Sequence, residues 1–224
     1  MRQESQKWHD TYRARELVAR RASSHKRKLA RLGVFDLPRD ARILDLACGA
    51  GEALQILRAE GFTHLYGVDV TADEALAREP WVEVKAGDAA SIPYPDATFD
   101  VVICMHSLHH LGGPERVRKS FYEALRVLKP NGLLALIDHY DSPQLRAAFW
   151  GLQKPWLTVT KGLRAFREQH EEEWPYMFEY LDAWPGLGAM LATLPCTGAK
   201  LHKGLFFFYW TGRKAEPVGG AQAS

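Results

Sequence analysis

A glycine-containing run, DLACGAG over residues 45–51, carries the clearest chemical signal in the sequence. Gly49 and Gly51 permit a tight turn and let a ligand approach the backbone closely, and a helix that follows would direct free N–H groups at an anion. A carboxylate or a phosphate on the ligand is therefore expected. Leu54 stands where the third glycine of the dinucleotide-binding pattern would be, which argues against a pyrophosphate cofactor.

Two further acids follow short apolar runs at comparable places. Asp69 ends the run YGVD, 20 residues after Gly49, a spacing that lets a carboxylate accept both hydroxyls of a ribose. Asp88, in the run GDA, could accept from an exocyclic amine beside an apolar pocket. Each acid alone is equally well explained as a strand-end or capping residue. Three acids in register with three successive strands indicate a ligand with an anionic end, a ribose and an amine.

The elements that position these acids follow from hydrophobic periodicity. The expected strands cover residues 43–46, 65–68, 81–85, 101–104 and 133–137, and the expected helices cover 52–60 and 117–128. Strands that are nearly all apolar and separated by helices form a parallel sheet covered on both faces. Residues 199–202 and 205–211 flank Lys203-Gly204 as a closing β-hairpin. The predicted fold is a Rossmann-like, doubly wound α/β domain with a seven-stranded, mostly parallel sheet.

The chain is predicted to form one domain over residues 1–214 and a disordered tail over 215–224. Within the domain we expect an N-terminal helical cover (1–40), a ligand-binding core (41–140), a helical insert broken by Pro155 and Pro175 (141–185), and a helix with the closing hairpin (186–214). Residues 1–34 hold ten Lys or Arg against three acids and should form one or two helices ended by Gly33. This basic stretch either covers the core as a solvated helix or attracts an anionic substrate, RNA or lipid.

Composition narrows the class of protein. With 224 residues, 46% hydrophobic residues and a formal net charge of +2, the chain can bury one core, and its charge gives no argument for a nucleic-acid or membrane partner. Cys48, Cys104 and Cys196 are widely spaced and odd in number, so neither a disulfide framework nor a metal site is expected. The sequence shows no membrane-spanning run and no signal-peptide core. A cytoplasmic location is the expectation.

Four runs together resemble the successive motifs of class I methyltransferases, particularly the group similar to quinone C-methyltransferases. They are ILDLACGAGEAL, YGVDV, GDAASIPYPDATFDVVICMHSLHHL and ALRVLKPNGLLALID, and they cover residues 41–139. The resemblance implies S-adenosylmethionine as the cofactor. It implies that the methionine part is held by Asp45 and by the loop residues Ala47, Cys48, Gly49, Ala50 and Gly51. Asp69 would take the ribose, and Val70 would lie beside the adenine. Asp88 and Ala89 would meet the adenine edge, and Met105 would line the sulfonium side.

Methyl transfer from a sulfonium depends mainly on holding the acceptor in line and excluding water, and it needs a base only when the acceptor must lose a proton. The candidates for a base are His109 and His110, and also His139, Tyr140 and the neighbouring Asp141, because all follow strands whose carboxyl ends bind ligands in open α/β sheets. A structural role is an equally serious reading for the two adjacent histidines.

Nine of the 25 aromatic residues lie between Phe149 and Trp184, which makes the insert a candidate lid over the acceptor. Trp156, Trp174 and Tyr176 are the predicted acceptor contacts, and packing within the lid is the alternative. An acceptor held by these rings would be planar and apolar, or a cationic amine.

The fourth predicted strand ends in Cys104-Met105-His106-Ser107, which lacks the Asn/Asp-Pro-Pro-aromatic motif of nucleobase and glutamine amino methyltransferases. No glutamate pair follows it, as protein arginine methyltransferases require, and no acid at the strand end suggests a catechol-type metal site. A small-molecule acceptor methylated on oxygen, carbon or nitrogen is the leading interpretation. The alternatives are an RNA methyltransferase and a non-catalytic module that binds the cofactor.

Overall fold

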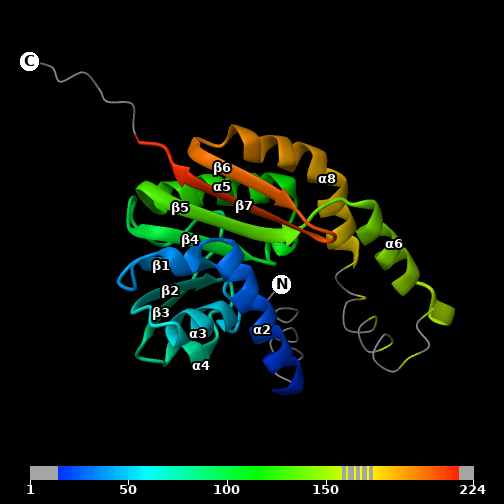
Figure 1. The fold of residues 1–224 in the computed structure, drawn as a ribbon, viewed down its shortest axis with the longest axis horizontal. Coiled ribbons are helices and arrows are strands. Elements are labelled where there is room, and N and C mark those ends of the chain that lie inside the picture. The colour runs from blue at the N-terminus through cyan, green and yellow to red at the C-terminus, as the bar shows by residue number, and fades with distance from the viewer. Residues whose placement is uncertain are drawn as a thin grey trace, which may run out of the picture.

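The computed structural model of the chain describes residues 15–157, 160, 164, 167, 171 and 174–216. A seven-stranded sheet runs through its centre in the order β3-β2-β1-β4-β5-β7-β6 (Figure 1). The first five strands pair in parallel, and β7 pairs antiparallel with both β5 and β6. The predicted fold and the closing hairpin are therefore confirmed. The strands are β1 (Arg42–Leu46), β2 (His64–Asp69), β3 (Val82–Ala86), β4 (Phe99–Met105), β5 (Leu128–His139), β6 (Cys196–Lys203) and β7 (Phe207–Lys214).

The strand order reverses between β1 and β4, because the chain winds from β1 outward to β3 and then returns to the other side of β1. In open parallel sheets this reversal leaves a crevice at the carboxyl ends of the two strands, and ligands bind there. Asp45 in β1 and Asp69 at the end of β2 lie along this edge. The fold thus gathers the predicted acids at one end of the sheet.

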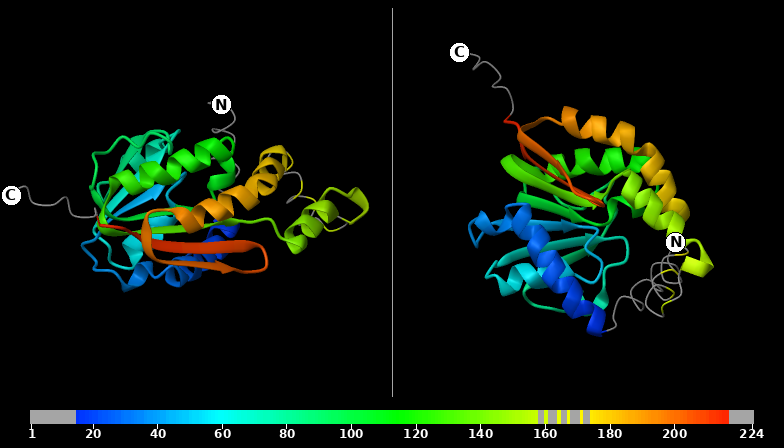
Figure 2. Two further views of the ribbon diagram at one scale, coloured as in Figure 1. Left: turned by 90° about the horizontal axis from the view of Figure 1, so that it is seen from above. Right: turned by 45° about the vertical axis from the view of Figure 1, so that its right-hand side comes forward.

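Helices cover both faces of the sheet (Figure 2). Residues of α2 (Arg15–Arg31), α3 (Glu52–Ala59) and the short α4 (Glu74–Ala77) pack on one face, where they meet side chains such as Ile103 and Ala135. Residues of α5 (Pro114–Val127), α6 (Pro143–Leu152) and α8 (Trp174–Thr193) pack on the other, against side chains such as Val102 and Leu134. Successive residues of one strand face opposite layers, as the pleat requires.

Local sequence signals account for the helix ends. Gly33, whose φ is 72°, follows α2 and ends it as predicted, since only glycine adopts this conformation without strain. Ser142 caps α6 by accepting the N–H of Leu145 at 3.1 Å, and Pro143 follows at the first helical position, where its missing N–H has no intrahelical partner. Three 3-10 helices complete the described elements: η1 (Val34–Asp36), η2 (Leu108–His110) and η3 (Pro155–Leu157).

Pro175, where the sequence predicts a break in the insert, stands at the start of a helix. It is the second residue of α8, and a proline in the first turn removes no intrahelical hydrogen bond. Pro185 lies inside the same helix, which continues to Thr193. The predicted boundary at residue 185 between the insert and the following helix therefore falls within one element.

Several predictions concern residues outside the described part of the chain. These residues are 1–14, most of 158–173, and 217–224, so the expected start of the N-terminal helices and nearly all of the expected tail cannot be compared with the structure. Among the described residues, no helix combines the length and the apolar character needed to cross a membrane.

Candidate active site

The glycine loop that joins β1 to α3 adopts left-handed backbone at three positions. The φ angles are 58° at Ala47, 51° at Gly49 and 75° at Gly51. A left-handed conformation costs a residue with a Cβ on the order of 1–2 kcal/mol, so the loop at Ala47 is strained. The loop is fixed from both sides, since the Cys48 N–H donates to the Val68 carbonyl at 3.1 Å and the Gly51 N–H donates to the Cys48 carbonyl at 2.8 Å.

Asp69 ties the end of β2 to this loop. One carboxylate oxygen accepts the N–H of Gly49 at 2.9 Å, and the other accepts the N–H of Thr71 at 2.9 Å and its hydroxyl at 3.2 Å. A carboxylate has about four acceptor positions, so Asp69 can still receive hydroxyl groups. Val70 next to it is 65% exposed.

Asp45 lies buried behind the loop. Burial raises the pKa of its carboxyl to about 8, and the nearby Asp69 carboxylate raises it further. A Cβ built on Gly49 would meet no atom within 4 Å, so the space in front of this glycine is open. Gly51 precedes α3 without offering a side-chain cap, which leaves the first N–H groups of the helix available. The site can accept a ligand that carries both a carboxylate and a cation.

The remaining predicted cofactor residues, among them Asp88, Ala89 and Met105, lie on the same edge of the sheet but differ in burial and in hydrogen-bond partners. Asp88 accepts the N–H of Ala90 and a guanidinium N–H of Arg116, each at 2.8 Å. Burial opposes ionisation of Asp88, but these two hydrogen bonds hold its pKa below the usual range. Arg116 was not predicted as a partner for Asp88, because the two residues lie 28 positions apart on different elements. Ala89 and Met105 are buried, and Ala50 at the turn is partly exposed.

The Cys48 thiol is not a nucleophile here. Burial raises its pKa, and the Asp45 and Asp69 carboxylates raise it further, so the thiol stays protonated.

Asp138, at the end of β5, organises the histidines on the acceptor side. It is fully buried and accepts the backbone N–H groups of Leu108 and His139, each at 2.7 Å, and it lies 2.8 Å from Nδ1 of His109. Burial would raise its pKa, but His109 and His139 hold the pKa well below the usual range. An acid ending an apolar strand is the signal that identified Asp45 and Asp69, yet sequence reasoning assigned no role to Asp138.

His109 and His110 belong to η2, and only His109 is buried. The His110 ring is exposed and its centroid lies 4.0 Å from that of His109. Nδ1 of His109 and the Asp138 carboxylate therefore form a buried acid–base pair.

His106 and His139 extend the histidine group toward α2. The ring centroid of His139 lies 5.4 Å from that of His109 and 6.1 Å from that of His106. Burial lowers the pKa of both imidazoles, so both are neutral. Nδ1 of His139 is buried without a hydrogen-bond partner, although it lies 3.4 Å from Asp138. His106 adopts φ 56°, another strained position at this edge.

His106, Asp138 and His139 offer ligand atoms within 4.8 Å of one another, a grouping that can hold a metal ion. Two of the three donors, on Asp138 and His106, are already engaged, however. Asp138 accepts from three residues, and Nε2 of His106 lies 2.7 Å from the Lys28 ammonium. A cation in this position disfavours a metal ion, so we interpret the group as an acid–base network.

The hydroxyl of Tyr140 is hydrogen-bonded away from the group formed by His106, Asp138 and His139. The hydroxyl donates to the Gly204 carbonyl in the hairpin turn at 2.6 Å, and the ring lies 5.9 Å from that of Trp184. The phenol fastens the end of β5 to the turn between β6 and β7. Asp141 likewise pairs with Arg146.

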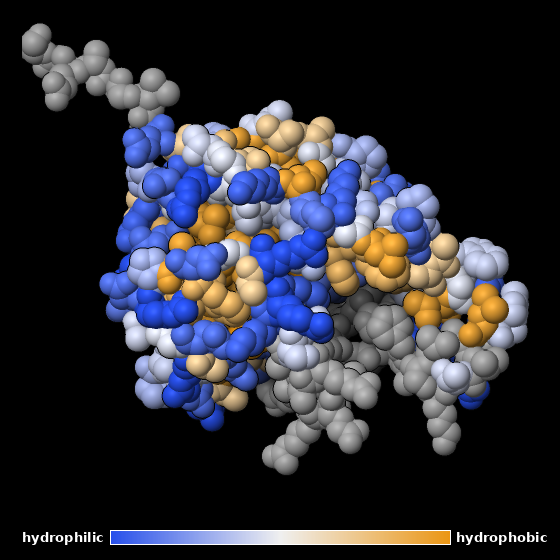
Figure 3. Space-filling view, viewed as in Figure 1, coloured by the Kyte–Doolittle hydropathy of each residue, from blue (hydrophilic) through white to orange (hydrophobic). Residues whose placement is uncertain are grey.

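The aromatic residues of the insert divide into two groups. Tyr180 and Trp184 lie on the face of α8 that is buried in the core. Trp156 is 68% exposed and Tyr176 is 52% exposed, and Trp174 is partly exposed with its indole nitrogen buried and unpaired. Figure 3 shows apolar surface over α6, beside the carboxyl edge of the sheet. Packing explains the first group, and the predicted acceptor contacts all belong to the second.

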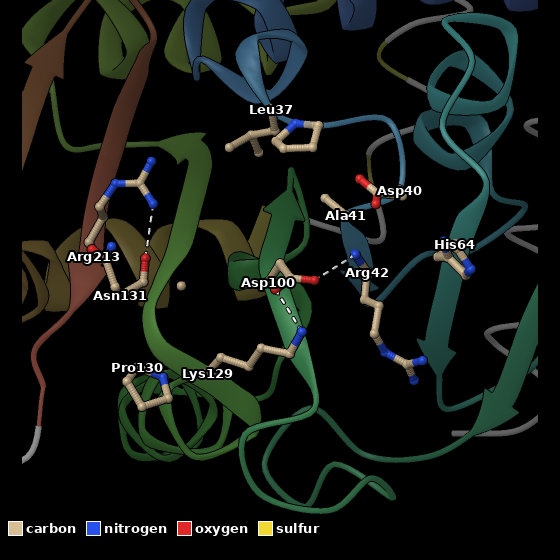
Figure 4. A pocket seen from close by; sticks show the side chains of 12 residues that line it. Leu37, Asp40, Ala41, Arg42, His64, Asp100, Lys129, Pro130, Asn131 and Arg213 are labelled. Carbon is tan, nitrogen blue, oxygen red and sulfur yellow. Dashed lines mark hydrogen bonds and ion pairs between the residues drawn. The ribbon is translucent and has the colours of Figure 1, made fainter.

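A cavity of about 660 Å³ lies at the opposite edge of the sheet (Figure 4). It is lined at the amino ends of β1 and β4, where Asp100 pairs with Lys129 at 2.7 Å and accepts the Arg42 N–H at 2.9 Å. The glycine loop is at the other end of β1. The cavity is separate from the candidate active site.

Comparisons with known proteins match the same part of the chain as the sequence motifs. Residues 44–136 match the family model for a methyltransferase domain. The chain is 36% identical over 107 residues to the uncharacterized methyltransferase YcgJ of Bacillus subtilis (strain 168), a match covering 44% of this chain and 41% of YcgJ. It is 29% identical over 163 residues to demethylmenaquinone methyltransferase of Clavibacter sepedonicus, covering 70% of this chain and 64% of that relative. The matches span less than two thirds of either relative.

A solved structure shows the same arrangement over more of the chain. The PH0226 protein from Pyrococcus horikoshii OT3 aligns with a TM-score of 0.62 and 25% sequence identity, covering 86% of this chain and 90% of that one. The family resemblance seen in the sequence motifs is thereby confirmed. In sequence and in fold the chain is similar to the class I methyltransferases, the family that uses S-adenosylmethionine as the methyl donor, and residues 44–136 carry the match to the methyltransferase domain.

Proposed function

We propose that this chain transfers a methyl group from S-adenosylmethionine to oxygen, carbon or nitrogen of a small molecule at the carboxyl edge of the sheet. The observation that carries the proposal is the contact between the glycine loop and the end of β4. The Ser107 hydroxyl lies 3.2 Å from the Ala47 carbonyl, which brings the histidine group of β4 and β5 against the cofactor loop. A methyl donor and an acceptor held on these two sides would be neighbours.

The residues at the loop fit S-adenosylmethionine. The open space at Gly49 leaves room for the methionine part, and the uncapped start of α3 would receive its carboxylate. Asp45 would meet its cationic groups, and Asp69 would accept the ribose hydroxyls. When bound, the cofactor supplies an electrophilic methyl group on a sulfonium.

The chain's own residues would supply positioning, exclusion of water and a proton acceptor. The buried pair of His109 and Asp138 would take the proton from an acceptor that must lose one. The insert would close the acceptor side with Trp156, Trp174 and Tyr176. A planar, apolar acceptor suits these rings, and the demethylmenaquinone methyltransferase among the relatives supports such a substrate.

The alternative of RNA modification rests on the basic N-terminal stretch. In the described part of α2, however, several cations are already engaged: Lys26 pairs with Glu60, Lys28 contacts His106, and Arg31 contacts His202. These contacts favour the interpretation of α2 as a cover for the core.

The test is a screen of the full chain with S-adenosylmethionine carrying a labelled methyl group. The acceptors are phenols, hydroquinones, amines and total RNA. We expect label in an organic extract from one small-molecule class, with Asp69→Ala as the inactive control. Label in RNA, with binding that weakens steeply as salt rises, would overturn the small-molecule proposal. Cofactor binding without transfer to any acceptor would favour a non-catalytic module.

A further inference from the structure

The N-terminal helix places a cation inside the acceptor side of the site. Nζ of Lys28, near the end of α2, lies 2.7 Å from Nε2 of His106 and 4.6 Å from the centre of the Phe207 ring. Sequence reasoning treated Lys28 as one of ten basic residues in a helical cover. In the structure, Lys28 differs from a solvated surface lysine because its ammonium group reaches the strand ends at His106 and Phe207.

Lys28 also lies beside the cofactor loop. One turn earlier on α2, Nδ1 of His25 is 3.5 Å from a carboxylate oxygen of Glu52, the first residue of α3. The ring of His25 is 5.8 Å from that of His106, and the next residue, Ser107, contacts the loop at Ala47. The neighbours of the ammonium group thus reach both the start of α3 and the cofactor loop at Ala47.

The charge on Lys28 is poorly compensated. Its nearest partners are an imidazole and an aromatic ring, and it forms no ion pair with a carboxylate in the described part of the chain. Burial lowers its pKa to about 8, and Arg27 opposes its charge, whereas the more distant Asp138 and Glu52 favour it. His106 is neutral, since burial and the Lys28 charge hold its pKa well below the usual range. A partly buried cation without a counterion is a binding site for an anion.

We propose that Lys28, oriented by His106, binds the acidic oxygen of the methyl acceptor and holds it as an anion, so that the acceptor is a phenol, a hydroquinone or an enol. The inference rests on the proposed function and names its substrate class. The acceptor's proton passes through the His109–Asp138 pair to solvent while Lys28 keeps its own. The resulting anion is the stronger nucleophile, at oxygen or at the adjacent ring carbon. Phe207 supplies an apolar wall beside the ring of the acceptor.

The test uses 4-nitrophenol, whose phenolate absorbs visible light, and needs no turnover. Spectra are recorded against pH with the full chain and S-adenosylhomocysteine present. We expect the wild-type protein to lower the apparent pKa of the probe and to bind it at least about tenfold more tightly than 4-nitroanisole, which has no acidic proton. Lys28→Met should abolish both effects, and Lys28→Arg should keep part of them.

Lys26→Met is the matched control, because Lys26 lies on the same helix but pairs with Glu60 at the surface, and it should behave as wild type. Thermal melts accompany each variant. If Lys28 is merely structural, Lys28→Met will lower the melting temperature and leave the absorbance shift per folded molecule intact, which would overturn the inference.

The two proposals fail separately. Calorimetric binding of S-adenosylhomocysteine with no phenolate shift in the wild type would overturn the Lys28 assignment and leave the methyltransferase proposal in place. Absence of cofactor binding would overturn the proposed function itself. A phenolate shift that survives Lys28→Met would show that another group binds the anion.

Discussion

The most perturbed acid on the cofactor side is Asp45, and its protonation should govern cofactor affinity. In the free protein its pKa is raised to about 8 by burial and by Asp69. A cationic ligand beside it would lower this pKa, so binding below pH 8 must release a proton. Affinity should rise with pH by up to roughly tenfold per unit and level off above about 8, where the carboxyl is already ionised.

Calorimetry in two buffers of different ionisation enthalpy measures the proton released. Asp45→Asn should weaken binding and flatten its pH dependence. A wild-type affinity that does not change between pH 6 and 8 would contradict the assignment of Asp45 to the cationic part of the cofactor.

Asp69 is expected both to bind the ribose and to hold the glycine loop, so its removal should lower cofactor affinity through two effects. Asp69→Ala removes the proposed ribose acceptor and also the bond to the Gly49 N–H that orders the loop. Loss of a charge-assisted site of this kind costs about 1.5–3 kcal/mol, or roughly 10- to 150-fold in cofactor affinity. Titration with S-adenosylhomocysteine measures it. Thr71→Val keeps the carboxylate and should have a much smaller effect, and equal affinities for wild type and a folded Asp69→Ala protein would refute the ribose assignment.

Much of the cofactor side could be predicted from the sequence because its residues are local to the strand ends. Asp45, the glycine loop and Asp69 each follow an apolar strand, and strand ends meet at one edge in any parallel sheet. The acceptor side could not be predicted in the same way. Lys28 reaches His106 across 78 positions, and Arg116 reaches Asp88 across 28. Such contacts depend on how helices pack, which periodicity does not specify.

At the scale of elements, the insert combines a buried part and an exposed part, and the two should respond differently to mutation. Trp156, in η3, is 68% exposed, so Trp156→Ala should change KM or kcat for the acceptor while cofactor affinity and melting temperature stay nearly constant. Trp184, in α8, packs on Phe208 with 4.6 Å between ring centres, and Trp184→Ala should destabilise the fold by about 3–5 kcal/mol.

Steady-state kinetics beside thermal melts separate the two effects. If Trp156→Ala leaves both kinetic constants unchanged, the exposed aromatic residues do not contact the acceptor and the lid interpretation fails. The insert's helical character followed from its sequence, but the limits of α8 did not, because a proline at position 2 of a helix and one in its interior look alike in a linear pattern.

At the scale of the molecule, the first described helix is fastened to the last strand. The guanidinium of Arg31 lies 4.5 Å from the centre of the Tyr209 ring, and Lys28 lies over Phe207. Tyr209→Ala should therefore loosen α2 against β7, with a loss of about 1–2 kcal/mol from the missing ring and its cation contact. Amide hydrogen exchange should quicken in α2 while the amides of β1 and β4 stay protected. Uniform acceleration across the sheet would show instead that the substitution disrupts the whole fold.

The alternation of strands and helices was enough to predict the parallel core and the hairpin, yet not where α2 would lie. The charge count of the N-terminal stretch allowed both a solvated cover and a binding face. The structure supports a part of both interpretations. Leu29 on α2 is buried in the core, whereas the neighbouring Lys28 contacts His106 at the strand ends.

The contacts of α2 with β7 have a consequence for the order in which the protein is made. The glycine loop and its acids lie within residues 45–69 and can assemble once the first half of the chain has left the ribosome. Lys28 leaves earlier still, but Phe207 and Tyr209, against which α2 rests, are among the last described residues to be translated. During synthesis, α2 therefore emerges before its partners on β7. The acceptor side of the site can be completed only after the ribosome has translated β7.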